Sequence, residues 1–213
     1  MSNSYKAAFR VQFVSKTYAG HEIAVSRCVL ASMKTLLSCG IVVALAAMQP
    51  VRSTTLEQLS LDDMIQKSTA IVRGKLQPTT AGYHGSIIYS HYQLNVAEVW
   101  KGSVGSSLDV AVPGGLVNGI RETYSGAPSL VSGQDYVLFL WTSKSGLTQV
   151  IGLSQGLFNV VTNAAGATIV SRSASAEPML NGSGQPVADS DFQMPLTQMR
   201  TLVQNAVRGR STP

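Results

Sequence analysis

The chain has little cysteine, and none after residue 39. Its only two cysteines among 213 residues are Cys28 and Cys39. The residues that follow can form no disulfide with one another and no zinc–thiolate site. A long apolar run is also missing, because the longest, residues 36–48, is shorter than the roughly twenty residues that a membrane-spanning helix needs. These absences exclude a disulfide scaffold and a protein anchored by a transmembrane helix.

The short apolar run follows an internal methionine, in the order of a secretory signal peptide. Lys34 comes directly after Met33, the apolar residues 36–48 are next, and a short polar segment then leads to small residues. This three-part layout is typical of a cleaved export signal. It predicts an exported protein, periplasmic or secreted, with no stable membrane anchor after cleavage. Residues 1–32 are then an upstream extension that arises from a misplaced start codon.

Cleavage defines the domain boundaries. We place the cleavage after Ser53, with Ala46 as the alternative position, because small residues suit both sites. A lipid-modified Cys39 is disfavoured, because too few apolar residues precede it. Residues 33–53 are therefore interpreted as the signal peptide and residues 54–213 as a single domain, which is long enough to bury its own core.

The predicted domain also lacks a surplus of positive charge. The whole chain carries a net charge of +5, from 16 Lys and Arg against 11 Asp and Glu. Six of the basic residues and one acidic residue lie within residues 1–53, so that ten of each sign remain in the domain. A basic domain would suggest a nucleic-acid partner. The balanced charge gives no reason to expect one.

Two helices are expected, one near each end of the domain. Ser60 stands three residues before Asp63, and the apolar residues that follow have helical spacing, which predicts a capped helix ending near Ser68. The second helix is expected after Pro195. Its apolar face would consist of Met199, Leu202, Val203 and Ala206.

Between these helices the sequence alternates short apolar segments with glycine-containing turns. We expect a turn that contains Pro78 and Gly82, a loop from Pro113 to Gly133, and an exposed hairpin or loop from Glu177 to Pro186. Strands are expected at residues 70–76, 87–100, 108–112, 136–141, 147–151, 157–161 and 168–171. This spacing favours a mainly β domain, built as a sandwich or a barrel.

One motif is typical of a serine hydrolase, but its context is wrong. Residues 152–156 match the pattern Gly-x-Ser-x-Gly, whereas no histidine follows Ser154 to act as its base. The order His91, then Asp109 or Asp135, then Ser154 would suit a chymotrypsin-like triad, although the surrounding sequence does not support it. A hydrolase remains a remote alternative, and the glycines are better explained by a strand corner.

Metal and phosphate sites find equally little support. His84 and His91 match no zinc-binding spacing, even with the carboxylates of the domain considered. The segment Pro113–Gly119 is rich in glycine but lacks the lysine and hydroxyl that hold phosphate and metal. We therefore expect no cofactor and no metal, and a protein that acts by binding and not by catalysis.

One strand face has the composition of a ligand-binding surface. Aromatic rings supply contact area at low entropy cost, and amides supply directional hydrogen bonds. The alternative is a solvated face enriched by β propensity. The first reading predicts a binding surface for a protein or a glycan of the cell envelope. Its candidate residues are Tyr89, His91, Gln93 and Asn95 on the strand, and Tyr83 and His84 before it.

Three segments together carry a family resemblance: residues 69–75, 96–102 and 133–140. Their strand and turn patterns resemble the netrin-like module of the tissue inhibitors of metalloproteinases, and exported bacterial proteins of the same arrangement. The resemblance implies a closed, OB-like β-barrel flanked by helices. It also suggests a second hypothesis, an inhibitor or accessory of a secreted metalloprotease. That family inhibits through an amino-terminal cysteine, which a chain that begins at Thr54 lacks, so any inhibition would use another route.

Overall fold

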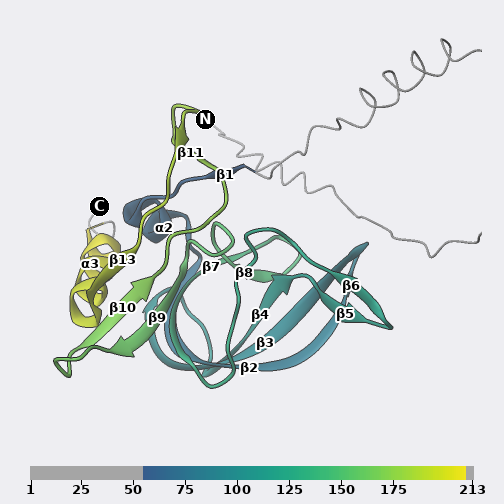
Figure 1. The fold of residues 1–213 in the computed structure, drawn as a ribbon. Coiled ribbons are helices and arrows are strands. Elements are labelled where there is room, and N and C mark those ends of the chain that lie inside the picture. Colours follow the sequence, from purple (N-terminus) through teal and green to yellow (C-terminus); the bar gives the residue numbers. More distant parts are fainter. Residues whose placement is uncertain (1–54, 210–213) are drawn as a thin grey trace, which may run out of the picture. The chain divides into compact units, whose positions relative to one another are not determined.

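A computed structural model describes residues 55–209 of the chain (Figure 1). The chain divides into two units, residues 1–52 and 53–213, and the described residues belong to the second. The predicted signal peptide and its upstream extension therefore lie outside the described residues. None of the helices within residues 55–209 has the length and apolar character needed to cross a bilayer.

The described part is mainly β, with one helix near each end, as predicted. The helices are α2 (Leu61–Lys67) and α3 (Leu196–Arg208). The strands are β1 (Leu56–Glu57), β2 (Ala70–His84), β3 (Ile87–Lys101), β4 (Ser107–Pro113), β5 (Gly115–Val117), β6 (Ile120–Glu122), β7 (Asp135–Thr142), β8 (Thr148–Val150), β9 (Leu157–Thr162), β10 (Thr168–Arg172), β11 (Met179–Leu180), β12 (Pro186–Val187) and β13 (Phe192–Pro195).

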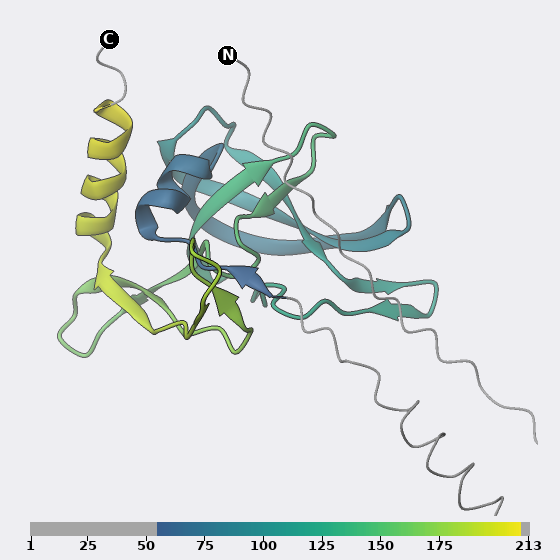
Figure 2. The same ribbon diagram turned by 90° about the horizontal axis from the view of Figure 1, so that it is seen from above.

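One large antiparallel sheet organises these elements. Its strand order is β13-β10-β9-β7-β2-β3-β4, and β8 pairs with the end of β7. A long, bent hairpin formed by β2 and β3 dominates the views in Figures 1 and 2. Two smaller sheets complete the structure: β5 pairs with β6, and β11 lies between β1 and β12.

The predicted closed barrel is not found within residues 55–209. The sheet curls so that β4 approaches β8, but no backbone ladder joins these two strands. One physical reason is the length of β8, whose three residues pair with β7 on one edge and leave only a short second edge for β4. The OB-like closure expected from the sequence therefore stops at a side-by-side approach of the two strands.

The predicted turn at Pro78 and Gly82 is also wrong. Both residues lie within β2, which continues to His84, and the hairpin turns at Gly85 with a φ of +65°. The register between β2 and β3 shifts between Pro78 and Ala81. Proline has no N–H to donate to a ladder, so a bulge is one of the few places where a strand accepts it.

The core has two parts, one on each face of the sheet. β7 contributes to both parts, because its successive side chains point to opposite faces. Val137 and Phe139 pack with the helices, whereas Tyr136, Leu138 and Leu140 pack against the curled hairpin. All five are at most 1% exposed. The sequence prediction of a central strand that is apolar on both faces is therefore confirmed for this part of β7.

Charged residues tie α3 to the sheet near this core. Arg73 Nη1 lies 2.8 Å from Glu98 Oε1, and Arg73 Nη2 lies 2.7 Å from Asp135 Oδ2. Glu98 also accepts a 3.0 Å hydrogen bond from Trp100 Nε1 and pairs with Arg200 of α3. The three segments that carry the family resemblance supply Arg73, Glu98 and Asp135 respectively. In this structure, those residues connect strands to each other.

Lys101 has a comparable structural role in the same region. Its ammonium group donates to the carbonyl oxygens of Ile65 and Ser68, each at 2.6 Å, at the end of α2. A cation at this end of a helix stabilises it, because the last carbonyls carry partial negative charge. The neighbouring Gly102 has a φ of +83°, and its backbone lies against Thr69. Lys101 and Gly102 thus hold the end of β3 against the end of α2.

The network should make stability depend on acid pH. Burial acts to raise the pKa of Glu98, but hydrogen bonds from Trp100 and Arg73 and the charge of Arg200 lower it overall. A carboxylate with a lowered pKa stabilises the fold above its unfolded pKa, about 4.3, and this contribution is lost as the pH falls through the folded pKa. Urea unfolding of Glu98→Gln should therefore show a smaller loss of stability between neutral and acid pH than the wild type shows. Equal losses would contradict a role of Glu98.

Candidate functional site: a polar face on strands β2, β3 and β4

Two rows of polar residues cross three neighbouring strands. Residues that are paired directly across adjacent strands have side chains on the same face of the sheet. The register places Gln93 of β3 between Gln77 of β2 and Asp109 of β4. It likewise places Asn95 of β3 between Lys75 of β2 and Ser107 of β4. These six residues and His91 are called the polar face below.

Four of the seven members of the polar face are already engaged in hydrogen bonds with one another. Asp109 Oδ2 lies 2.7 Å from His91 Nδ1, and Gln93 Nε2 donates to Ser107 Oγ. The bond to Asp109 holds the imidazole in place and leaves Nε2 as the ring nitrogen that can meet a ligand. These contacts fix the orientation of four neighbouring side chains before any ligand arrives.

The other three members of the polar face have no side-chain hydrogen bond among the described residues. Lys75, Gln77 and Asn95 are exposed, and among the described residues no side-chain hydrogen bond or ion pair engages any of them. An exposed primary amide offers both donors and acceptors. The face therefore combines fixed polar groups with groups that are available to a ligand.

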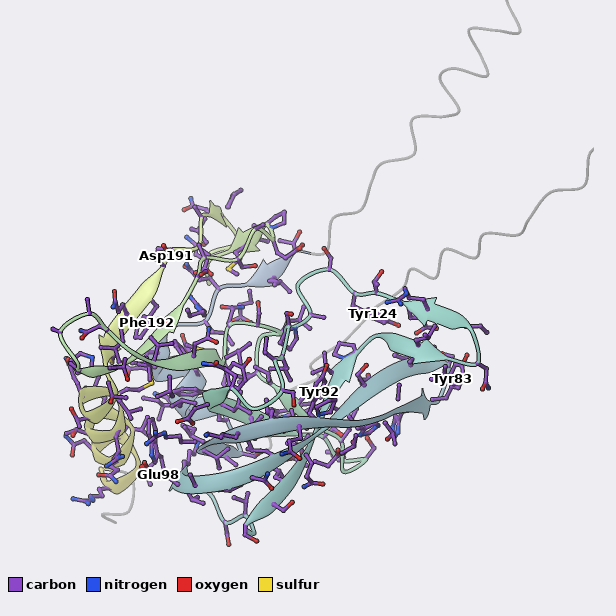
Figure 3. The ribbon with its side chains drawn as sticks, turned by 60° about the horizontal axis from the view of Figure 1, so that its bottom comes forward. Tyr83, Tyr92, Glu98, Tyr124, Asp191 and Phe192 are labelled. Carbon is purple, nitrogen blue, oxygen red and sulfur yellow. The ribbon has the colours of Figure 1, made fainter. Side chains whose placement is uncertain are left out.

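The six residues predicted from the sequence do not form one surface. His91, Gln93 and Asn95 lie together, as expected. Tyr83 is paired with Ile88 of β3, so both side chains lie on the sheet face opposite to the polar face. Ile88 is fully buried there, whereas Tyr83, at the end of the hairpin, is 49% exposed (Figure 3). Tyr83 is thus separated from the polar face by the sheet.

Tyr89 differs from the prediction as well, because it is only 8% exposed. Its ring meets the edge of the His84 ring at a centroid distance of 6.1 Å. Edge-to-face ring pairs of this kind add to packing energy. Tyr89 is therefore part of the core at the end of the hairpin, and it offers no contact area to a ligand.

The segment after β6 closes this end of the hairpin. Glu122 Oε2 accepts hydrogen bonds from the Ile88 amide at 2.9 Å and from the Tyr124 hydroxyl at 3.3 Å. Burial, followed by the charge of Glu122, raises the pKa of Tyr124. Beyond these contacts the β5–β6 hairpin exposes Leu116 and Ile120, each about half accessible. The β5–β6 hairpin thus presents two large apolar side chains to solvent, unlike the polar face.

Sequence reasoning missed four members of the polar face: Lys75, Gln77, Ser107 and Asp109. Lys75 and Gln77 alternate with the buried residues Gly74 and Leu76, and that alternation was a signal that could have placed them outward. Ser107 and Asp109 could be joined to the site only through the register of β3 with β4. That register depends on long-range pairing.

The structure gives Ser154 no catalytic partners. His91 and Asp109 do meet, as one of the predicted orders requires. Within residues 55–209, however, no hydrogen bond joins Ser154 to either of them. The next residue, Gln155, is 1% exposed, and its amide bonds the backbone of Leu59 at 2.8 Å and of Glu57 at 2.9 Å. The turn that contains Ser154 and Gln155 therefore holds β1 and the residues directly after it in place.

A metal centre is also without support in the described part of the chain. No group of three or more His, Cys, Asp or Glu residues there could hold a metal ion. Compared with known proteins, the chain has no significant match to a protein-family model, a curated protein or a solved structure.

Proposed function

We propose that residues 54–213 form an exported binding module of the periplasm or the extracellular space. The module recognises a protein or a glycan of the cell envelope through the polar face. The observation that carries this proposal is the pair of three-residue rows across β2, β3 and β4, in which free hydrogen-bonding groups on the β2 side lie next to fixed ones on the β4 side.

A glycan suits this face better than a protein partner does. Hydroxyl groups of a sugar require donors and acceptors side by side, which the amides, the hydroxyl and the imidazole supply. Protein interfaces usually depend on buried Trp, Tyr or Arg anchors, and none of these residue types is among the seven members of the face. The charges of Lys75 and Asp109 balance, which favours a neutral ligand over a nucleic acid or another polyanion.

The position of the face agrees with an OB-like ancestry, which we include in the proposal. OB-folds are five-stranded, partly open barrels that bind oligosaccharides and oligonucleotides on their second and third strands. The curled strands β2, β3, β4, β7 and β8 would correspond to such a barrel, left open between β4 and β8. The part of the polar face on β3 and β4 would then lie on the strands that bind ligands in that fold.

The double variant Gln77→Ala with Asn95→Ala tests the proposal. Each lost hydrogen bond costs about 0.5–1.5 kcal/mol, so the pair should weaken glycan binding roughly tenfold. Binding of the exported protein to a panel of soluble envelope glycans is measured by calorimetry or on an array. The matched control is Thr168→Ala with Gln193→Ala, two exposed residues on β10 and β13.

The outcome is decided by comparing the two double variants. Both should unfold at the wild-type temperature, because all four side chains are exposed. Loss of glycan binding in the Gln77 and Asn95 double variant, but not in the control, would support the polar face as the binding surface. Equal retention of the bound glycan by both variants would exclude the face as the binding surface.

A further inference from the structure

A cavity lies away from the polar face, at the junction of the small three-stranded sheet with the large sheet. It encloses about 380 Å³, within the range of small-molecule sites in proteins. Four parts of the chain form its walls: the entry to α2, the strands β9 and β10, the turn between β11 and β12, and the start of β13. Its lining includes Gln58, Met64, Phe158, Arg172, Ser190 and Phe192.

The deep side of this pocket is apolar. Phe158 is fully buried and Met64 is 3% exposed. Phe192 joins them, with its ring centroid 5.2 Å from that of Phe158 in an edge-to-face arrangement. Phe192 belongs to β13, beside Asp191 (Figure 3). Phe158 and Met64 lie beneath the surface, so an apolar ring or a short branched chain would pack against the partly buried Leu59, Leu61 and Phe192 above them.

The polar part of the wall is held rigidly. Arg172 donates to the carbonyl oxygen of Gln155 at 3.0 Å and pairs with Asp189 at 2.9 Å. The amide of Gln155 in turn holds the backbone of Leu59 at 2.8 Å. A ligand that enters such a pre-formed pocket orders few side chains, so that little of its binding energy is lost to entropy.

The charges around the pocket disfavour an anionic ligand. Among the described residues that line the pocket, Arg172 is the one cation, and it is neutralised by the carboxylate of Asp189, whose side chain is only 5% exposed. Asp63 presents a second carboxylate. Its hydrogen bond from the Ser60 hydroxyl lowers its pKa, so it stays ionised at neutral pH. Ser60, Ser190 and Asn181 supply neutral polar groups at the rim.

We propose that this pocket binds a small, neutral molecule with an apolar ring or short branched chain and one or two hydrogen-bonding groups. The site is separate from the polar face and does not depend on the function proposed for that face. Binding would bridge the β1–β11–β12 sheet and the large sheet, because both contribute to the wall. It should therefore stabilise the attachment of β1 to the rest of the structure.

Fluorescence titration with the neutral probe N-phenyl-1-naphthylamine tests the pocket in the full-length protein. The wild type should show a saturable increase with one site. Ser190→Phe places a ring at the entrance and should weaken this binding at least tenfold. Ser132→Phe puts the same ring on an exposed position outside the pocket and should bind the probe like the wild type.

The comparison of the two phenylalanine variants decides the result. Equal binding by Ser190→Phe and Ser132→Phe, or the absence of a saturable signal in the wild type, would overturn the proposal. Thermal unfolding shows whether Ser190→Phe keeps the wild-type fold. If it does not, Gln58→Trp narrows the pocket from another segment and replaces it in the same comparison.

Discussion

Asp189→Ala is expected to lower the free energy of unfolding by about 3–5 kcal/mol, the usual cost of removing one partner from a buried ion pair. The side chains of Asp189 and Arg172 are only 5% and 14% exposed. The variant leaves the guanidinium buried without its counter-charge. It also removes the acceptor of a 2.9 Å hydrogen bond from the Ser175 amide. Urea unfolding of the purified variant measures the loss.

Asp109→Ala is the matched control, because its carboxylate also pairs with a neighbour but is 54% exposed. An exposed pair contributes little, typically less than about 1 kcal/mol. A similar loss in both variants would contradict the role assigned to burial. Replacement of both Arg172 and Asp189 by apolar residues of similar volume should recover much of the stability, because no unpaired charge then remains.

Gly74→Ala is expected to cost stability near the upper end of the roughly 1–3 kcal/mol typical of overpacking. An added Cβ would lie 2.2 Å from the backbone oxygen of Asn95 on the paired strand. That atom belongs to a hydrogen-bonded sheet and cannot swing aside as a flexible side chain would. The register between β2 and β3 shifts next to Gly74, so the bulge brings the two backbones close together. Thermal or urea unfolding measures the effect.

Gly82→Ala on the same strand provides the control. An added Cβ there meets nothing within 4 Å, and the residue has no positive φ. Such a substitution should leave stability unchanged or raise it by about 0.4–1 kcal/mol, because alanine restricts the unfolded chain. If the two alanine variants have the same stability, the close approach at Gly74 does not limit the fold.

Local features of the structure could be predicted well from the sequence. Ser60 and Asp63 form the expected capping box, since its hydrogen bonds join residues only three positions apart. The central strand β7 was recognisable because both of its faces are apolar. The hairpin of β11 and β12 lies where a hairpin was expected. In α3, Met199 and Val203 are buried as predicted, but Leu202 is 40% exposed.

Features that depend on distant pairing could not be predicted in this way. Pro78 indicated a turn, but the long partner strand β3 carries β2 past it through a bulge. Tyr89 has the alternation of an outward residue, yet it is covered at the end of the hairpin. The curled sheet approaches closure without pairing β4 to β8. In each case the outcome depends on which segment lies opposite, and sequence periodicity does not contain that information.

From the sequence alone follow the β-rich class, the helix near each end, the neutral charge of the domain, and the lack of cysteine after residue 39. Each of these follows from composition or from contacts within a few residues. The three-dimensional structure was needed to show that Arg73, Glu98 and Asp135 form one network, and that polar residues of three strands form one face. It was also needed to show that the entry to α2, the strands β9 and β10, the turn between β11 and β12 and the start of β13 line one pocket. Strand register and packing bring these residues together, and both are set by contacts between residues far apart in the chain.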